Sequence, residues 1–130
     1  MANFLVLGAP SETFTAKVIT TNIAKGDAVK FAAGGVTPAG DGDTVDGFAI
    51  TTATVGNYVT CVRGAMSVIG RAAAAVDFNV GDQVYIAAAT QTLDTGSVGN
   101  KSVGVVVGDD PASAGWVEFR FDPLATFTHA

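Results

Sequence analysis

The sequence predicts a single all-β domain, built as a β-barrel or as a β-sandwich. Its apolar residues are strongly β-branched, with 18 Val, 5 Ile and 15 Thr against only 4 Leu, and such residues pack well on a pleated surface. Short alternating segments are separated by Gly, Asp and Pro throughout the chain, which is typical of small all-β folds. The length of 130 residues suits one core, and 48 % hydrophobic against 15 % charged residues excludes a disordered chain.

Eight segments have the composition and alternation of strands. In chain order they are Lys17–Asn22, Ala28–Ala32, Gly47–Thr52, Tyr58–Val62, Met66–Ile69, Gln83–Ala87, Ser102–Val107 and Trp116–Phe121. In the last of them Glu118 and Arg120 share one face, so Val117, Phe119 and Phe121 are expected to point inward.

Two segments have distinct patterns. Val103–Val107 is nearly continuous Val, which predicts a strand covered on both faces. Arg71–Val76 contains four consecutive Ala without an amphipathic pattern, and either a short helical turn or an extended loop fits it.

The chain contains an internal repeat. GDAVKF at 26–31 is echoed by GDQVYI at 81–86, GFAI at 47–50 by GVVV at 104–107, and GNYV at 56–59 by GWV at 115–117. The matches are collinear and predict two copies of one β unit, at about 24–60 and 79–121. Two copies are too few for a solenoid. We expect a β domain over 16–123, an extended N-terminal arm over 1–15 and a C-terminal tail over 124–130.

Two long loops, Ala33–Asp46 and Ala88–Lys101, occupy equivalent places in the two copies. Connections longer than about 12 residues without regular structure usually mark binding or assembly surfaces. The sequence therefore predicts that function resides on these loops or on the chain ends.

Charge and cysteine content exclude several classes of protein. The net charge is −5 and no cluster of Lys and Arg exists, so neither nucleic acid nor an anionic membrane is an expected partner. The single cysteine, Cys61, cannot form an intramolecular disulfide, and the N-terminus has no signal-peptide pattern. Synthesis in the cytoplasm is expected.

The candidate chemical motifs are incomplete. Asp41, Asp43 and Asp46 lack the ligand spacing of a calcium loop, so no metal is expected. His129, the only histidine, is next to the C-terminus and gives Cys61 no positioned base, so we predict a buried, inert thiol and no enzyme or cofactor. The aromatic residues Phe31, Phe48 and Phe78 are expected in the core.

The order of motifs resembles a family of small tailed-bacteriophage proteins that decorate, or cement, the capsid exterior. The resemblance spans roughly residues 17–121 and is carried by GDAVKF, DGFAIT, GNYVTCVRGAMSV, NVGDQVYI and KSVGVVVGDDPASAGWVEFRF. It implies a β-rich barrel or tulip domain without enzymatic activity. It also implies a homotrimer that binds the major capsid protein on the outside of the virion. Another virion component, such as a head-fibre base or a tail-associated domain, and a free ligand-binding barrel are the alternatives.

The first fifteen residues carry only one charge, Glu12, which is unusual for a free terminus. The predicted capsid or subunit contact residues are therefore the apolar ones of this arm: Phe4, Leu5, Val6, Leu7, Pro10 and Phe14. Such an arm could add a strand to a neighbour's open sheet edge. In the alternative interpretation the segment is the first strand of its own barrel.

Overall fold

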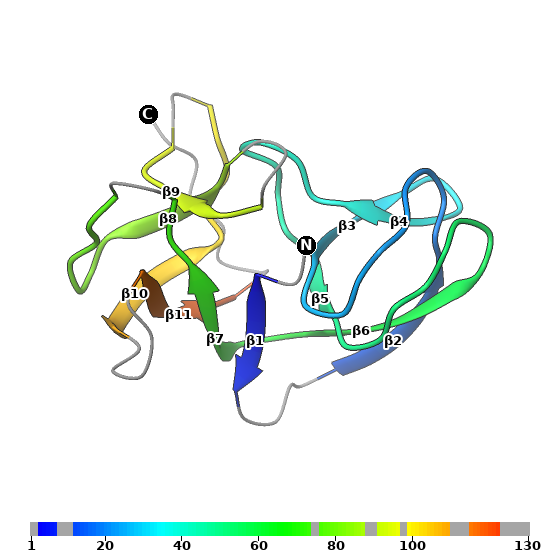
Figure 1. Cartoon of the computed structure of the whole chain (residues 1–130), viewed down its shortest axis with the longest axis horizontal. Coiled ribbons are helices and arrows are strands. Elements are labelled where there is room, and N and C mark those ends of the chain that lie inside the picture. The colour runs from blue at the N-terminus through cyan, green and yellow to red at the C-terminus, as the bar shows by residue number, and fades with distance from the viewer. Residues whose placement is uncertain are drawn as a thin grey trace.

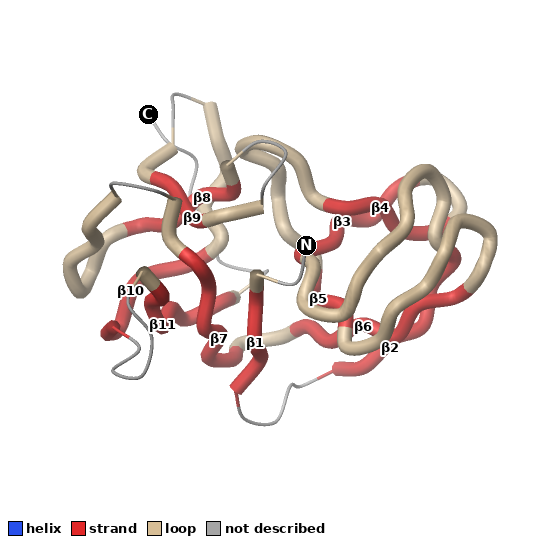
Figure 2. The backbone as a smooth tube through the Cα atoms, viewed as in Figure 1, coloured by secondary structure: helices blue, strands red, loops and turns tan. Residues whose placement is uncertain are grey.

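The computed structural model describes residues 3–7, 12–73, 76–87, 91–96, 99–109 and 115–122. These residues form eleven strands and no helix, which confirms the predicted all-β fold (Figure 2). The strands are β1 (Phe4–Leu7), β2 (Glu12–Lys17), β3 (Ala28–Ala32), β4 (Gly35–Pro38), β5 (Gly47–Ala49), β6 (Tyr58–Arg63), β7 (Met66–Arg71), β8 (Gln83–Ile86), β9 (Leu93–Asp94), β10 (Gly104–Asp109) and β11 (Trp116–Phe121). In this part of the chain there is no helix that could cross a membrane.

The strands form two antiparallel sheets that share one strand order, which confirms the internal repeat (Figure 1). The five-stranded sheet has the order β2-β6-β5-β3-β4, and the six-stranded sheet has the order β1-β7-β11-β10-β8-β9. The registers also agree, because Val29 lies opposite Gly47 and Val84 lies opposite Gly104. The structural repeat therefore includes β2 and β7, which precede the repeated motifs. We name residues 12–63 unit 1 and residues 66–121 unit 2.

The repeated Gly-Asp turns have the same hydrogen bonds in both units. The carboxylate Oδ2 of Asp27 accepts the amide of Ala24 at 2.9 Å, and that of Asp82 accepts the amide of Asn79 at 2.8 Å. The glycines before them, Gly26 and Gly81, have φ of 91° and 96°, a conformation that favours glycine. The repeated motif thus encodes a defined turn at the start of β3 and of β8.

Each unit is curled, because one parallel bridge links the residue after its first strand to the last strand in its sheet order. A parallel bridge joins Val18 to Val36 in unit 1, and the equivalent bridge joins Ala72 to Leu93 in unit 2. The interior of unit 1 is one buried cluster, composed of Val18, Ile23, Val29, Val36, Ala49, Ala53, Val59 and Cys61.

The second core cluster fills unit 2 and also joins it to unit 1. Ala28, Phe48 and Val62 on the outer face of unit 1 belong to it, together with Phe119 and Phe121 of unit 2. The rings of Phe48 and Phe121 lie 4.9 Å apart in an edge-to-face arrangement. As predicted, Phe48 and Phe78 are core residues, and Val117, Phe119 and Phe121 point inward.

Other sequence-based expectations were wrong. The strand expected at Lys17–Asn22 is instead β2 at Glu12–Lys17, because its partner β6 continues to Arg63 and pairs with residues as early as Glu12. The two long loops contain β4 and β9, which are short edge strands. Val107 is exposed rather than covered, since β10 changes register after Val106.

The N-terminal segment is not a separate arm in the described residues. Strand β1 pairs with β7 of unit 2, and the predicted boundary between residues 15 and 16 falls inside β2. The first-strand alternative therefore describes residues 4–7. Between Arg71 and Val76 the described residues are not helical, which favours the extended alternative.

Candidate interaction surface

The predicted contact residues are divided between a buried and an exposed set. Phe4 is only 6 % exposed, and its ring lies 5.1 Å from that of Phe48 in the second core cluster. Leu5, on the other face of β1, is 57 % exposed, whereas Val6 and Leu7 are half-buried. Pro10 lies outside the described residues. Phe4 is therefore a core residue, and a partner could reach only the remaining side chains of β1.

Phe14, the last of the predicted contact residues, belongs to an aromatic cluster at one end of unit 1. Its ring lies 5.4 Å from the ring of Phe31, and the Cζ atom of Arg63 lies 5.2 Å from the centroid of Phe31. The Nε–H of Arg63 also donates to the carbonyl oxygen of Asp46 at 2.9 Å. We call Phe14, Phe31 and Arg63 the rim of unit 1. The structure brings them together from β2, β3 and β6.

Phe31 corrects the expectation that this residue is in the core, because it is 49 % exposed. It shares the inward side of β3 with Val29, which is fully buried. However, Phe31 lies one step closer to the end of the strand, where nothing among the described residues fully covers the unit. Alternation in the sequence indicates the face of a residue, but it does not indicate where the covered part of that face ends.

The equivalent rim of unit 2 is covered within the chain. The positions of Phe14, Phe31 and Arg63 correspond to Val68, Ile86 and Phe121, all of which are buried. The side chain of Phe48 on the outer face of unit 1 packs against this end of unit 2. The rim of unit 2 is thus buried by other parts of the chain and the rim of unit 1 is partly exposed, although the strands around the two rims are equivalent.

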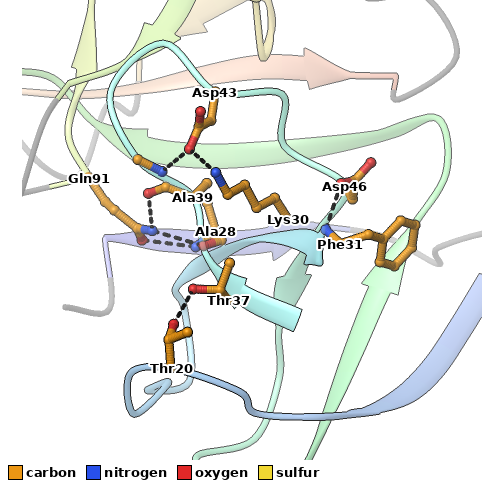
Figure 3. A network of polar contacts seen from close by, with 10 residues as sticks. Thr20, Ala28, Lys30, Phe31, Thr37, Ala39, Asp43, Asp46 and Gln91 are labelled. Carbon is orange, nitrogen blue, oxygen red and sulfur yellow. Dashed lines mark hydrogen bonds and ion pairs between the residues drawn. The ribbon is translucent and has the colours of Figure 1, made fainter. Parts of the chain in front are cut away.

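The acidic loop before β5 uses its carboxylates for local contacts. Oδ2 of Asp43 accepts the Nζ of Lys30 at 2.8 Å and the amide of Gly40 at 2.7 Å (Figure 3). Oδ2 of Asp46 accepts the amide of Phe31 at 2.8 Å, on the opposite side of the loop (Figure 3). These carboxylates point to different partners, and in the described parts of the chain no group of three His, Cys, Asp or Glu side chains is placed to hold a metal.

The two long loops take part in a contact between the units, and we call the hydrogen bonds of Gln91 with Ala28 and Ala39 the clasp. Gln91, in the second loop, is only 2 % exposed and inserts its side chain beside β3. Its Oε1 accepts the amide of Ala28 at 3.0 Å, and its Nε2 donates to the carbonyl oxygens of Ala28 and Ala39 at 2.8 Å each (Figure 3). Where they are described, these loops thus contribute to the attachment of unit 2 to unit 1. Sequence reasoning found the loops but not this role, because an isolated Gln carries no sequence signal.

The single cysteine has the environment expected of a structural residue. Cys61 lies on β6 inside unit 1 and is fully buried. Burial raises the pKa of its thiol to about 12, so the reactive thiolate is disfavoured at neutral pH. His129 lies outside the described residues.

Comparisons with models of protein families, with curated proteins and with solved structures find no match to this chain.

Proposed function

We propose that the protein is a capsid decoration protein, which binds the outer surface of a tailed-bacteriophage head and stabilises the shell. The order of motifs over residues 17–121 supports this function by its resemblance to that family. The structural observation that carries the proposal is the uncovered rim of unit 1, where Phe31 remains 49 % exposed beside Phe14. A half-exposed aromatic pair on a β scaffold is typical of a surface that becomes buried against protein.

The two-unit architecture supports a stabilising role. A decoration protein must transmit binding energy from one contact to another, which requires that its parts do not move freely. The aromatic contacts of Phe48 and the hydrogen bonds of Gln91 join the units across a buried interface. Binding through one unit therefore fixes the position of the other.

The partners in this proposal are the major capsid protein and further copies of the same chain. A homotrimer is the expected assembly, because closed cyclic contacts satisfy exposed surfaces without open-ended growth. Multi-angle light scattering on the purified protein tests this assembly. A clean dimer would contradict the trimer.

Co-sedimentation with empty heads, assembled from the major capsid protein encoded in the same genome, tests the function. The wild-type protein should sediment with the heads, and Phe31→Ser should weaken its affinity for them at least about tenfold, which corresponds to about 1.4 kcal/mol. Val80→Ser is the matched control, because Val80 is an exposed apolar residue of a turn in unit 2. Failure of the wild-type protein to sediment with heads would refute the proposal, and full occupancy of Phe31→Ser would exclude the rim as the contact surface.

A free ligand-binding module is the second candidate, and the arrangement at Phe31 is the observation that favours it. A guanidinium over an exposed ring, as in the pair of Arg63 and Phe31, also suits stacking of a planar or sugar ligand. Saturable binding of a soluble glycan without binding to heads would favour this candidate. Binding to tails or fibres instead of heads would identify another virion component.

A further inference from the structure

Strand β1 extends unit 2 by one strand, and unit 1 has no equivalent strand among the described residues. In unit 2, Phe4 to Leu7 pair with Gly70 to Ser67 on the edge of β7. The residues of unit 1 equivalent to Ser67–Gly70 are Thr13–Ala16 of β2, because Lys17 lies opposite Tyr58 as Arg71 lies opposite Trp116. β2 is an edge strand of its sheet. Just after β2, Val18 forms a single bridge to Val36 of β4, but no described strand pairs with Thr13–Ala16 on the edge that faces away from β6.

Backbone direction confirms that this edge offers hydrogen-bonding groups. The amide of Val18 donates to the carbonyl oxygen of Asn57 at 2.9 Å, and the carbonyl oxygen of Val18 accepts the amide of Gly56 at 2.8 Å. The backbone groups of Val18 therefore point toward the turn before β6. Because these groups alternate along a strand, those of Thr13 and Thr15 point away from β6, toward the open edge. In unit 2 the equivalent outward amide of Arg71 donates to the carbonyl oxygen of Asn3 at 3.2 Å, just before β1.

Burial shows the consequence of the missing strand. The inward residues of β7, which are Met66, Val68 and Gly70, are all buried. Their equivalents in β2 are Glu12, which is exposed, and Phe14 and Ala16, which are half-buried. The uncovered rim of unit 1 is thus continuous with the open edge of β2.

We propose that the edge of β2 at Thr13–Ala16 is a strand-addition site for an extended apolar segment of another protein. Main-chain hydrogen bonds to Thr13 and Thr15 would hold the segment, and its inward side chains would cover Phe14 and Ala16. The charged residues Glu12 and Lys17 lie at the two ends of the site. Such charges on an edge strand disfavour nonspecific pairing with longer strands of other proteins. This proposal goes beyond the proposed function, because it holds whichever protein supplies the segment.

The geometry also defines the side chain that the site accepts. In unit 2 the Phe4 ring lies where a Cβ on Gly70 would be only 2.9 Å away, so the glycine makes room for the aromatic ring. Unit 1 has Ala16 at this position, and its methyl group occupies that space. The segment that binds β2 therefore carries a small aliphatic residue, such as Val, where β1 carries Phe4.

Peptide binding followed by NMR tests the proposal on the full-length protein. The probe is a capped peptide with the sequence of residues 2–9, with Phe4→Val and two added lysines for solubility. It should bind with a dissociation constant below about 1 mM. Binding should shift the amide signals of Thr13 and Thr15 and slow their hydrogen exchange at least about tenfold. The same peptide N-methylated at the Leu5 and Leu7 amides cannot make the edge hydrogen bonds and should not bind.

Two protein variants complete the test. Thr15→Pro removes one outward amide while leaving the pairing with β6 intact, so it should abolish peptide binding. Ala16→Gly should reverse the preference, so that the peptide with the natural Phe4 binds more tightly than the Val peptide. If Thr15→Pro fails to fold, the N-methylated peptide provides the same test on the wild-type protein.

Three outcomes would overturn the proposal. They are absence of binding, signal shifts confined to β7, and protection of Thr13 and Thr15 that rises with protein concentration alone. The last of these would identify a second copy of this chain as the occupant. If Thr15→Pro folds and still decorates heads, the capsid contact lies elsewhere and the proposed function stands without this site.

Discussion

Replacement of Gln91 by Ala should weaken the attachment between the two units. The substitution removes three buried hydrogen bonds that join the second long loop to Ala28 and Ala39. The carbonyl oxygen of Ala28 keeps one bond, from the amide of Ala39 at 2.9 Å. The amide of Ala28 and the carbonyl oxygen of Ala39 lose their bonds to the glutamine.

The magnitude follows from these two backbone groups. An unsatisfied buried polar group costs about 1–3 kcal/mol, so the two cost about 4 kcal/mol together. Release of the ordered glutamine side chain returns about 1.5–2 kcal/mol of conformational entropy. The free energy of unfolding should therefore fall by about 2 kcal/mol. Gln91 has φ of 52°, so Gln91→Gly, which relieves this conformation, should be destabilised by about 1 kcal/mol less than Gln91→Ala.

Urea denaturation measures the effect, and a loss of 2 kcal/mol should lower the midpoint by about 1 M. Hydrogen exchange at the Ala28 amide should accelerate in the same variant, because this amide loses the glutamine Oε1. Asn57→Ala is the control, since its side-chain amide bonds only the exposed hydroxyl of Thr54, and it should stay within about 0.5 kcal/mol of wild type. If Gln91→Ala matches this control and leaves Ala28 protected, the clasp does not join the units.

Three further comparisons of variants test the packing. Phe4→Ala should lower the free energy of unfolding, measured by urea denaturation, by about 3–5 kcal/mol because the ring is buried. Replacement of the exposed Leu5 by Ala should change it by no more than about 0.5 kcal/mol. Equal losses in the two variants would contradict the orientation of β1. Gly104→Ala should cost about 1–3 kcal/mol because a Cβ would collide with the backbone carbonyl of the neighbouring strand β11, and Gly108→Ala, which meets no atom within 4 Å, should melt near the wild-type temperature. Burial raises the pKa of the Cys61 thiol from its ordinary value of 9.0 to about 12. Between these two values the thiol loses its proton in the unfolded chain but keeps it in the folded protein. The contribution of the buried thiol to the free energy of unfolding is therefore complete below pH 9 and declines as the pH rises toward 12. The stability difference between wild type and Cys61→Ala should therefore shrink above pH 9, and a constant difference would contradict the burial.

The sequence by itself determined the fold class, the faces of the strands and the existence of a repeat. These features depend largely on local patterns, because side chains alternate between the two faces of a strand and turn residues separate one strand from the next. The turns at Asp27 and Asp82 are an example, since each is built by its own motif. The burial of Val117 and Phe119 likewise follows from alternation within one strand.

Only the tertiary structure decided which surfaces of the two units are covered. Gln91 and Ala28 are 63 residues apart in the chain, and Phe48 meets Phe121 from the other unit, so no local pattern indicates either contact. The same holds for Phe4, whose apolar segment suits a free arm and a strand equally well until β7 is placed beside it. Two nearly equivalent units acquire different surfaces because they pack asymmetrically, with β1 and Phe48 covering the rim of unit 2 and leaving that of unit 1 uncovered. That asymmetry is a property of the assembled fold, and it creates the candidate surface at Phe31.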